Sequence, residues 1–301
     1  MQVNESYESY KNSNAMDYIE LLKPRVMFLS IFTSACGIIL NPNSIHPFLG
    51  IMGIVCIAMG AGASGCINMW IERYIDGKMS RTKNRPIPSG RVSSNEALAL
   101  GVFLSVFSVT MIGLFVNILS ALLLAFTIFF YCVIYTIYLK PNTTQNIVIG
   151  GLAGALPPVI GWSCSSDVNS LMPWVLMLII FLWTPPHFWA LSMTLEDDYK
   201  NAKYPMMSII KGKSETNHWI MIYTLTCVIS SLIPLGIGYG GIFYFIISIS
   251  FGMFFIFKSA QLMKYGTNKK AMELFLFSII YLFVIFLSLT VENFVINKLA
   301  P

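Results

Sequence analysis

Charged residues are scarce in this chain of 301 amino acids. Asp, Glu, Lys and Arg make up 11% of it, whereas hydrophobic residues make up 56%. A soluble domain carries about 25% charged residues, so this balance excludes a soluble globular protein and indicates a membrane-embedded chain. The formal net charge of +5 does not indicate a nucleic-acid partner, because the basic residues are confined to short segments between apolar stretches.

The sequence also lacks CxxC pairs and zinc-ligand spacings, although it has six cysteines. Each cysteine lies in or beside an apolar segment, so buried thiols are expected rather than disulfides or a structural metal. The N-terminus lacks the apolar core of a signal peptide and the Arg-rich, acid-poor pattern of a mitochondrial presequence. We expect residues 1–16 to form a polar cytosolic tail leading into an amphipathic helix near Met16.

Long apolar runs dominate what is present. Nine of them can span about 30 Å of hydrocarbon, and we predict spans at 25–41, 48–70, 95–116, 118–139, 147–164, 172–195, 218–239, 241–263 and 272–294. The pattern predicts an all-α integral membrane protein that forms a single polytopic domain over residues 1–301. Pro157-Pro158 and Pro185-Pro186 are expected to kink or interrupt their helices, next to a central cavity.

Basic residues alternate along the predicted spans. Lys and Arg precede the first span and occupy every second loop after it, whereas the intervening loops at 41–47, 117, 165–171 and 240 contain none. Only Lys298 departs from this alternation. The positive-inside rule then places the N-terminus and the basic loops in the cytoplasm and the C-terminus outside. The regularity itself favours the odd count of nine spans.

Three oxygen-bearing side chains recur every four residues at the end of the second span: Asn68, Glu72 and Asp76. On a helix this spacing places them on one face. The basic residues that follow are Lys78, Arg81, Lys83, Arg85 and Arg91. Oxygen ligands suit Mg²⁺ and cationic side chains suit phosphate, so the stretch predicts a site for a metal-bridged diphosphate. The alternative is a charged helix end with snorkelling side chains beside a positive-inside loop.

A second acidic cluster, Glu196-Asp197-Asp198, follows the sixth span and precedes Lys200 and Lys203. Two such clusters on one membrane face can meet across a cavity, each holding Mg²⁺ with a diphosphate between them. The alternative is a solvated helix C-terminus. Acids there oppose the helix macrodipole, so a cationic partner is expected.

Four stretches carry a family resemblance: Asn68-x3-Glu72-x3-Asp76-x2-Met79-x-Arg81-Thr82-x2-Arg85-Pro86, NIVIGGLAGALPPVIGW (146–162), FLWTPPHFWALS (181–192) and DDYKNAKYPMM (197–207). In this order they resemble the protohaem IX farnesyltransferases, which are UbiA-type intramembrane prenyltransferases. The TPPHFW and RTxxRP strings together separate that family from quinone and chlorophyll prenyltransferases.

The resemblance implies nine transmembrane helices around a central cavity, with cytosolic cap loops that carry both acidic motifs. It implies Mg²⁺ as cofactor, and farnesyl diphosphate and protohaem IX as substrates. The farnesyl group joins a vinyl group of protohaem with addition of water, giving haem O and diphosphate for terminal oxidases. The implied surroundings are a bacterial inner membrane and its lipid bilayer, with haem A synthase or terminal oxidase assembly factors as candidate partners.

The same resemblance assigns roles to residues. It implies that Asn68, Glu72, Asp76 and Asp198 are catalytic and that they bind metal together with Asp197. The implied diphosphate-binding residues are Arg81, Lys83, Arg85, Lys140 and Lys200. Two positions depart from the family pattern: Thr194 stands where an Asp-x3-Asp motif would begin, and Pro141 follows Lys140 where Arg is usual.

His187 is the one histidine inside a predicted span to which we give a role. We hypothesise that it is an axial ligand or orienting contact for the haem iron, mainly because of the resemblance. It lies eleven residues, or roughly 16 Å of helix, from Asp198. Equally, it can hydrogen-bond a carbonyl freed near Pro185-Pro186.

Two other functions compete with this interpretation. A related prenyltransferase would use an aromatic or quinone-precursor acceptor. A polytopic transporter would carry charges near the midplane and inverted repeats, whereas the acids here cluster at one predicted face.

Overall fold

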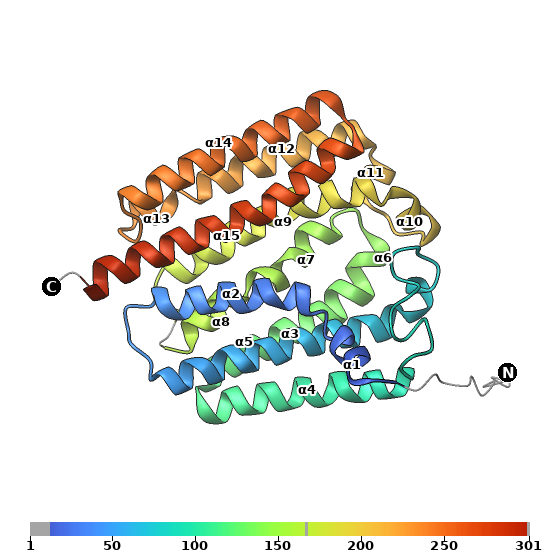
Figure 1. The fold of residues 1–301 in the computed structure, drawn as a ribbon, viewed down its shortest axis with the longest axis horizontal. Helices are drawn as coiled ribbons and strands as arrows, with labels where there is room; N and C mark the ends of the chain where they lie inside the picture. The colour runs from blue at the N-terminus through green and yellow to red at the C-terminus, as the bar shows by residue number, and fades with distance from the viewer. Residues whose placement is uncertain (1–12, 166–167, 300–301) are drawn as a thin grey trace.

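The protein folds into a bundle of helices (Figure 1), and the computed structural model describes residues 13–165 and 168–299. No strand occurs within these two ranges, which confirms the all-α prediction. The helical elements are α1 (Ala15–Leu21), α2 (Pro24–Leu40), α3 (Pro47–Asp76), α4 (Ser94–Phe115), α5 (Ile118–Phe129), η1 (Phe130–Leu139), α6 (Lys140–Asn142), α7 (Asn146–Ala155), α8 (Pro157–Ser163), α9 (Met172–Thr194), α10 (Glu196–Asn201), α11 (Met207–Ile210), α12 (Lys213–Ser230), α13 (Ile233–Gly236), α14 (Ile242–Tyr265) and α15 (Asn268–Leu299).

The predicted spans correspond one by one to helical segments of the structure. Within the described ranges, eight segments are long and apolar enough to cross a membrane, and the α1–α2 pair, bent by 57°, makes a ninth. The count of nine agrees with the alternation of basic loops. The second span is longer than predicted, because α3 continues through the acidic stripe to Asp76. The stripe is therefore part of the membrane helix and not of a separate loop.

The bend between α1 and α2 lies at Lys23. This residue has φ 53° and ψ 61°, in the left-handed region, which costs a non-glycine residue roughly 1–2 kcal/mol. Pro24 follows as the first residue of α2, and a residue before proline is disfavoured in the right-handed helical region. The turn leaves α1 at the end of the bundle while α2 enters it (Figure 1). Residues 1–12 of the predicted polar tail lie outside the described residues.

The connections divide between the two ends of the bundle (Figure 1). We name as the cap end the one that holds α1, the segment 77–93, α6, α10, α11 and the turn between α14 and α15. The links α2–α3, α4–α5, α8–α9 and α13–α14 lie at the opposite end. The basic loops that the sequence placed on one side all belong to the cap end. This arrangement does not fit the transporter alternative, which predicts charges near the midplane.

The two proline pairs behave differently. Pro157-Pro158 begins α8 directly after α7 has ended, with Leu156 between them, so the expected break is present. Pro185-Pro186 lies inside the continuous helix α9, so this pair does not interrupt its helix, and the kink that was the other expectation stays a prediction. Helix α9 packs against α7, α12 and α15, and burial among neighbouring helices allows proline to be accommodated within a membrane helix.

Close backbone contact joins α2 to α8. A Cβ atom on Gly37 would lie 2.2 Å from the carbonyl oxygen of Pro158, and one on Gly161 would lie 2.0 Å from the carbonyl oxygen of Ser34. Small residues allow helix backbones to approach in lipid, where packing and not the hydrophobic effect drives association. This contact anchors α2, and with it Lys23, against the rest of the bundle.

A buried carboxylate accepts hydrogen bonds from the N-terminus of α14, at the end of the bundle opposite the cap end. Glu292 of α15 accepts hydrogen bonds from the backbone N–H groups of Gly241 (2.8 Å), Phe243 (3.0 Å) and Tyr244 (2.9 Å). The N-cap residue of α14, Gly241, has no side chain to do this. Since the first N–H groups of a helix lack intrahelical partners, Glu292 replaces a local cap with one from another span.

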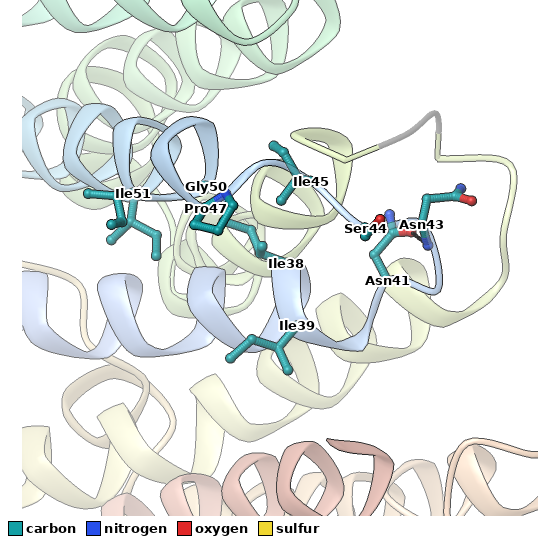
Figure 2. Close-up of a pocket in the computed structure, with 10 residues that line it drawn as sticks. Ile38, Ile39, Asn41, Asn43, Ser44, Ile45, Pro47, Gly50 and Ile51 are labelled. Atoms are coloured by element: carbon teal, nitrogen blue, oxygen red, sulfur yellow. Dashed lines mark hydrogen bonds between the residues drawn. The ribbon is translucent and has the colours of Figure 1, made fainter. Parts of the chain in front are cut away.

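A pocket of ≈ 230 Å³ lies where α2 ends and α3 begins (Figure 2). It is at the end opposite the cap and is lined by Ile38, Ile39, Asn41, Asn43, Ser44, Ile45, Pro47, Gly50, Ile51 and Ile54. None of the site residues predicted from the sequence lines it, so it is separate from the diphosphate site that the sequence predicts.

Candidate active site at the cap end

The acidic stripe lies on the last three turns of α3, on the side that faces the bundle interior. Asn68, Glu72 and Asp76 are exposed by only 2%, 4% and 3%. Their four-residue spacing places them on one face, as predicted. Snorkelling side chains at a charged helix end would reach water. The burial of all three therefore argues against that alternative.

Three basic side chains each contact one residue of the stripe, in order along the helix. Going toward the C-terminus of α3, Lys23 donates to Asn68 Oδ1, Lys140 donates to Glu72 Oε1, and Arg85 Nη1 donates to Asp76 Oδ2 at 2.7 Å. The group contains two carboxylates and three basic side chains, so its formal charge is one positive unit when all three are protonated. A buried site with excess positive charge attracts anions. These six residues are named the cap-end cluster below.

Lys23 is a member of the cluster that sequence reasoning missed. The sequence treated it only as one of the basic residues that indicate topology. Its left-handed backbone at the α1–α2 bend turns the side chain toward Asn68. Strained backbone conformations concentrate at functional sites, but a sequence alone does not reveal that Lys23 has one.

A π-helix brings the second wall of the cluster into place. In η1, Thr136 accepts a hydrogen bond from Asn68 Nδ2 (3.1 Å) and donates one to the carbonyl of Tyr131 (2.8 Å). Lys140 follows directly after η1. Such wide turns occur mostly as short features at functional sites, and this one extends over ten residues. The wide turn aligns Thr136 and Lys140 with Asn68 and Glu72, respectively.

The departure at Pro141 does not remove Lys140 from the site. Pro141 lies in the first turn of the short helix α6, where a proline needs no N–H partner. The side chain of Asn146 donates to the carbonyls of Lys140 (3.3 Å) and Thr143 (2.8 Å), which closes the loop. Lys140 thus keeps its contact with Glu72.

Tyr204 is a second residue that sequence reasoning missed. Its hydroxyl donates to Glu72 Oε1 at 2.9 Å, and Lys140 Nζ lies 4.8 Å from the centroid of its ring. The residue is 5% exposed. Tyr204 belongs to the motif DDYKNAKYPMM, yet its position in that motif does not indicate which acid it would reach. The fold of the α10–α11 segment makes the contact.

The RTKNRP string forms a turn that closes the end of α3. Thr82 Oγ1 donates to the carbonyl of Asp76 (2.8 Å), and Arg85 reaches back to the carboxylate of the same residue. One threonine thus satisfies a last-turn carbonyl of the helix. The turn directs Arg85 inward, whereas Arg81 and Lys83 are exposed. Of the three residues predicted here, one belongs to the cluster.

Asp198 joins the two acidic motifs through backbone contacts. Its Oδ1 accepts the N–H of Ser80 (3.0 Å) and its Oδ2 accepts the N–H of Arg81 (3.2 Å). Burial by itself would raise the pKa of Asp198, but these hydrogen bonds and the charge of Arg81 outweigh it and hold the pKa below its ordinary value. The two acidic motifs therefore do meet at the cap end. The contact is made by the Asp198 carboxylate and the backbone N–H groups of Ser80 and Arg81.

The rest of the second motif faces away from the cluster. Glu196 pairs with Lys200 (2.8 Å) and Lys213 (3.1 Å), and Asp197 is exposed. These acids begin α10 and do not end α9, so the alternative of a solvated helix C-terminus is wrong, and Glu196 has the cationic partners that were expected. Acids in a first turn interact favourably with the macrodipole. Thr194 Oγ1 donates to a carbonyl of its own helix.

The donor set of the cluster fits Mg²⁺ in kind, since amide and carboxylate oxygens are the ligands that this ion prefers. Within residues 13–165 and 168–299, no three His, Cys, Asp or Glu side chains lie together in a metal-binding arrangement. Asn68, Glu72 and Asp76 instead each hold a cationic side chain. Asp197 and Asp198 contribute no oxygen to the cluster as the structure has it.

His187 lies within α9, apart from the cluster, and is 8% exposed. Its Nδ1 is 2.7 Å from Ser278 Oγ of α15. Its ring stacks on Trp183 and on Phe275, with centroids 4.1 Å and 4.6 Å away. The imidazole is held by α15 on one ring nitrogen and between two aromatic rings.

Comparison with known sequences finds a match between residues 30–287 and the UbiA prenyltransferase family. A protoheme IX farnesyltransferase from Rickettsia bellii is 50% identical over 288 residues, which cover 95% of this chain and 96% of that protein. The protein of the same name from Rhizobium johnstonii is 49% identical over 293 residues, covering 96% and 91%.

Solved structures of low sequence identity share the fold. A digeranylgeranylglyceryl phosphate synthase superposes with a TM-score of 0.77 at 21% identity, covering 92% of this chain and 98% of that one. A UbiA homologue from Archaeoglobus fulgidus, bound to GPP and Mg²⁺, superposes with a TM-score of 0.65 at 16% identity, covering 91% and 99%.

Proposed function

This chain belongs to the UbiA prenyltransferase family, and we propose that it transfers the farnesyl group of farnesyl diphosphate to protohaem IX. The farnesyl carbon joins a vinyl group of the porphyrin, water adds, and the products are haem O and diphosphate. Identity near 50% over almost the whole chain to proteins named protoheme IX farnesyltransferase carries this proposal. The positively charged cap-end cluster supports it, because a leaving diphosphate needs such a site.

The cations of the cluster are proposed to hold the diphosphate. Lys23, Arg85 and Lys140 already lie partly buried beside the stripe, so little reorganisation is needed for them to meet phosphate oxygens. Arg81, Lys83 and Lys200 are proposed as outer contacts, and the first two belong to the segment that Asp198 holds in place. When diphosphate binds, these cations leave their partners in the stripe and contact phosphate oxygens instead.

The same exchange releases the acids to bind metal. Asn68, Glu72 and Asp76 are proposed to hold Mg²⁺, and Asp197 and Asp198 stay candidates for a second ion. When bound, Mg²⁺ would neutralise charge on the leaving diphosphate. Tyr204 orients Glu72 by its hydrogen bond. The UbiA homologue from Archaeoglobus fulgidus was solved with Mg²⁺ and GPP, which supports a metal-dependent site of this kind.

The acceptor is proposed to bind near His187, with one ring nitrogen toward the haem iron. Stacked Tyr131 and Tyr135, whose centroids are 5.4 Å apart, are proposed to line the path of the farnesyl chain near the stripe. Aromatic faces stabilise an allylic cation. A site closed to water would delay hydrolysis of that cation until the vinyl carbon has reacted.

The protein is a multi-pass membrane protein. We propose that its cap end faces the cytoplasm of a bacterium across the inner membrane, with the N-terminus inside and the C-terminus outside, since the basic segments gather at that end. We also propose that residues 1–301 form a single domain, because α15 packs against both α2 and α9. Haem A synthase or oxidase assembly factors remain candidate partners on the resemblance alone.

The decisive experiment incubates the purified protein with protohaem, farnesyl diphosphate and Mg²⁺ and separates the haems by chromatography. Haem O is expected for the wild type and is expected to be absent for Asp76→Asn. Glu273→Gln is the matched control, because Glu273 also pairs with two lysines, Lys258 and Lys270, outside the cluster. Failure of the wild type under conditions that activate a related enzyme would defeat the proposal.

A further inference from the structure

Two short contacts bear on the proton positions around His187. Ser278 Oγ lies 2.6 Å from the carbonyl oxygen of Phe275 and 2.7 Å from His187 Nδ1. A carbonyl can only accept a hydrogen bond, and a serine hydroxyl has one proton to give. The contact with Phe275 is the shorter of the two, and when the proton goes there, Ser278 Oγ accepts from His187. In that arrangement the hydrogen of the neutral imidazole is on Nδ1.

The lone pair of this tautomer is on Nε2. Trp183 and Phe275 stack on the ring, and Ser278 takes the Nδ1 edge. In this arrangement Nε2 is the ring nitrogen left to bind iron, and it carries no proton. The tautomer of a metal-binding histidine is set by the hydrogen bond at its other nitrogen.

Ser278 is itself held from a second side. Trp183 Nε1 donates to the carbonyl oxygen of Ser278 at 2.7 Å, and the Ser278 side chain is fully buried. Trp183 therefore contacts both the imidazole and the residue that fixes it. The arrangement locks the position of Oγ against His187, so the ring can neither rotate nor exchange its proton without breaking a buried contact.

We propose that Ser278 is a positioning residue that holds His187 as the Nδ1–H tautomer, with Nε2 ready to ligate the iron of the haem acceptor. This inference rests on the proposed function, in that it takes haem as the group that His187 meets. Without the Ser278 hydroxyl, the proton can move to Nε2 and block the iron-binding atom. The hydrogen bond also raises the basicity of the imidazole as a ligand.

The experiment compares Ser278→Val with Ser278→Thr, which have the same shape and differ by the hydroxyl. Protohaem is titrated into each purified protein, and its affinity, Soret band and ferrous iron–imidazole Raman stretch are recorded. We expect the Val variant to bind haem about tenfold more weakly and to lower the stretching frequency, and the Thr variant to match the wild type. If the Val variant does not fold, Ser278→Ala replaces it.

Two controls separate the possible outcomes. Ser288→Val removes a buried hydroxyl of the same helix that donates to the carbonyl of Ile285, and it should match the wild type. His187→Phe keeps a ring between Trp183 and Phe275 and should abolish the iron–imidazole band. If that band disappears in His187→Phe but Ser278→Val matches Ser288→Val, the positioning role is overturned and the haem contact stands.

If His187→Phe leaves the haem spectrum unchanged, His187 is not the ligand and the inference is overturned with it. The wild-type assay for haem O still decides farnesyl transfer separately. A defect in Ser278→Val that the Thr variant does not rescue would also overturn the inference, because it would show dependence on side-chain volume and not on the hydroxyl.

Discussion

Removing the carboxylate of Asp198 should detach the 77–93 segment from α10. The contact consists of two hydrogen bonds from backbone N–H groups, of Ser80 (3.0 Å) and Arg81 (3.2 Å), to an ionised side chain. Hydrogen bonds to charged groups contribute about 1.5–3 kcal/mol each. We take the lower value, since Ser80 and Arg81 are exposed and water can replace the lost acceptor. The sum of about 3 kcal/mol corresponds to roughly a hundredfold change in the docking equilibrium.

Limited trypsin digestion measures this directly, because Lys78, Arg81 and Lys83 all lie in the segment. In detergent solution, Asp198→Ala should be cut there up to about a hundredfold faster than the wild type. Asp198→Asn should fall between the two, since its amide presents one oxygen and one N–H₂ group to two donors. Asp197→Ala removes an exposed neighbouring carboxylate and should be cut at the wild-type rate.

The contact should also depend on pH. The pKa of Asp198 is lowered in the fold, so its contribution is complete above its unfolded pKa of about 3.9 and is lost as the pH falls through the folded pKa. Trypsin sensitivity near neutral pH should accordingly be flat for the wild type. If Asp198→Ala is cut no faster than Asp197→Ala but needs more Mg²⁺ for activity, Asp198 is a metal ligand and our reasoning about the contact is refuted.

Three further predictions follow from single contacts. Glu292→Ala should lower the free energy of unfolding by about 3 kcal/mol or more, since three N–H groups at the start of α14 lose their acceptor. A melting temperature equal to that of the wild type, measured by size-exclusion chromatography of heated samples, would contradict this. Gly37→Ala should prevent correct folding, because its Cβ would lie 2.2 Å from a backbone carbonyl oxygen of α8. Gly154→Ala, whose Cβ would have no atom within 4 Å, should be tolerated, and equal expression of the two variants would contradict the close packing of α2 on α8. Tyr204→Phe should reduce kcat about tenfold by freeing Glu72 and leave the melting temperature within a few degrees; wild-type turnover would exclude an orienting role.

The sequence was most informative about features that depend only on the spacing of residues along the chain. Apolar run length and the alternation of basic loops predict nine spans, because both depend on hydrocarbon thickness and loop charge alone. The spacing of Asn68, Glu72 and Asp76 predicts a shared helix face for the same reason. The sequence did not show that the second acidic motif begins a new helix, because only one residue, Leu195, separates α9 from α10. Nothing in local composition marks that break.

Only the tertiary structure decided which cations meet the acidic stripe. Lys23, Arg85 and Lys140 come from three segments far apart in sequence, and each reaches one stripe residue. These side chains are directed toward the stripe by the bend at Lys23, the turn before Arg85 and the wide helix before Lys140. Their directions depend on packing between distant segments, which cannot be read from residue spacing.

The same distinction applies to His187. Its residue type and its place in a span can be read from the sequence, and they suggest a ligand or a hydrogen-bonding group. Its contact with Ser278, which lies 91 residues away, appears only in the fold. The sequence by itself determined the membrane class, the number of spans and the family, since those depend on composition and motif order. The tertiary structure decided which polar side chains of the site meet one another, because a buried charged group is stable only beside a partner and that partner comes from a neighbouring segment.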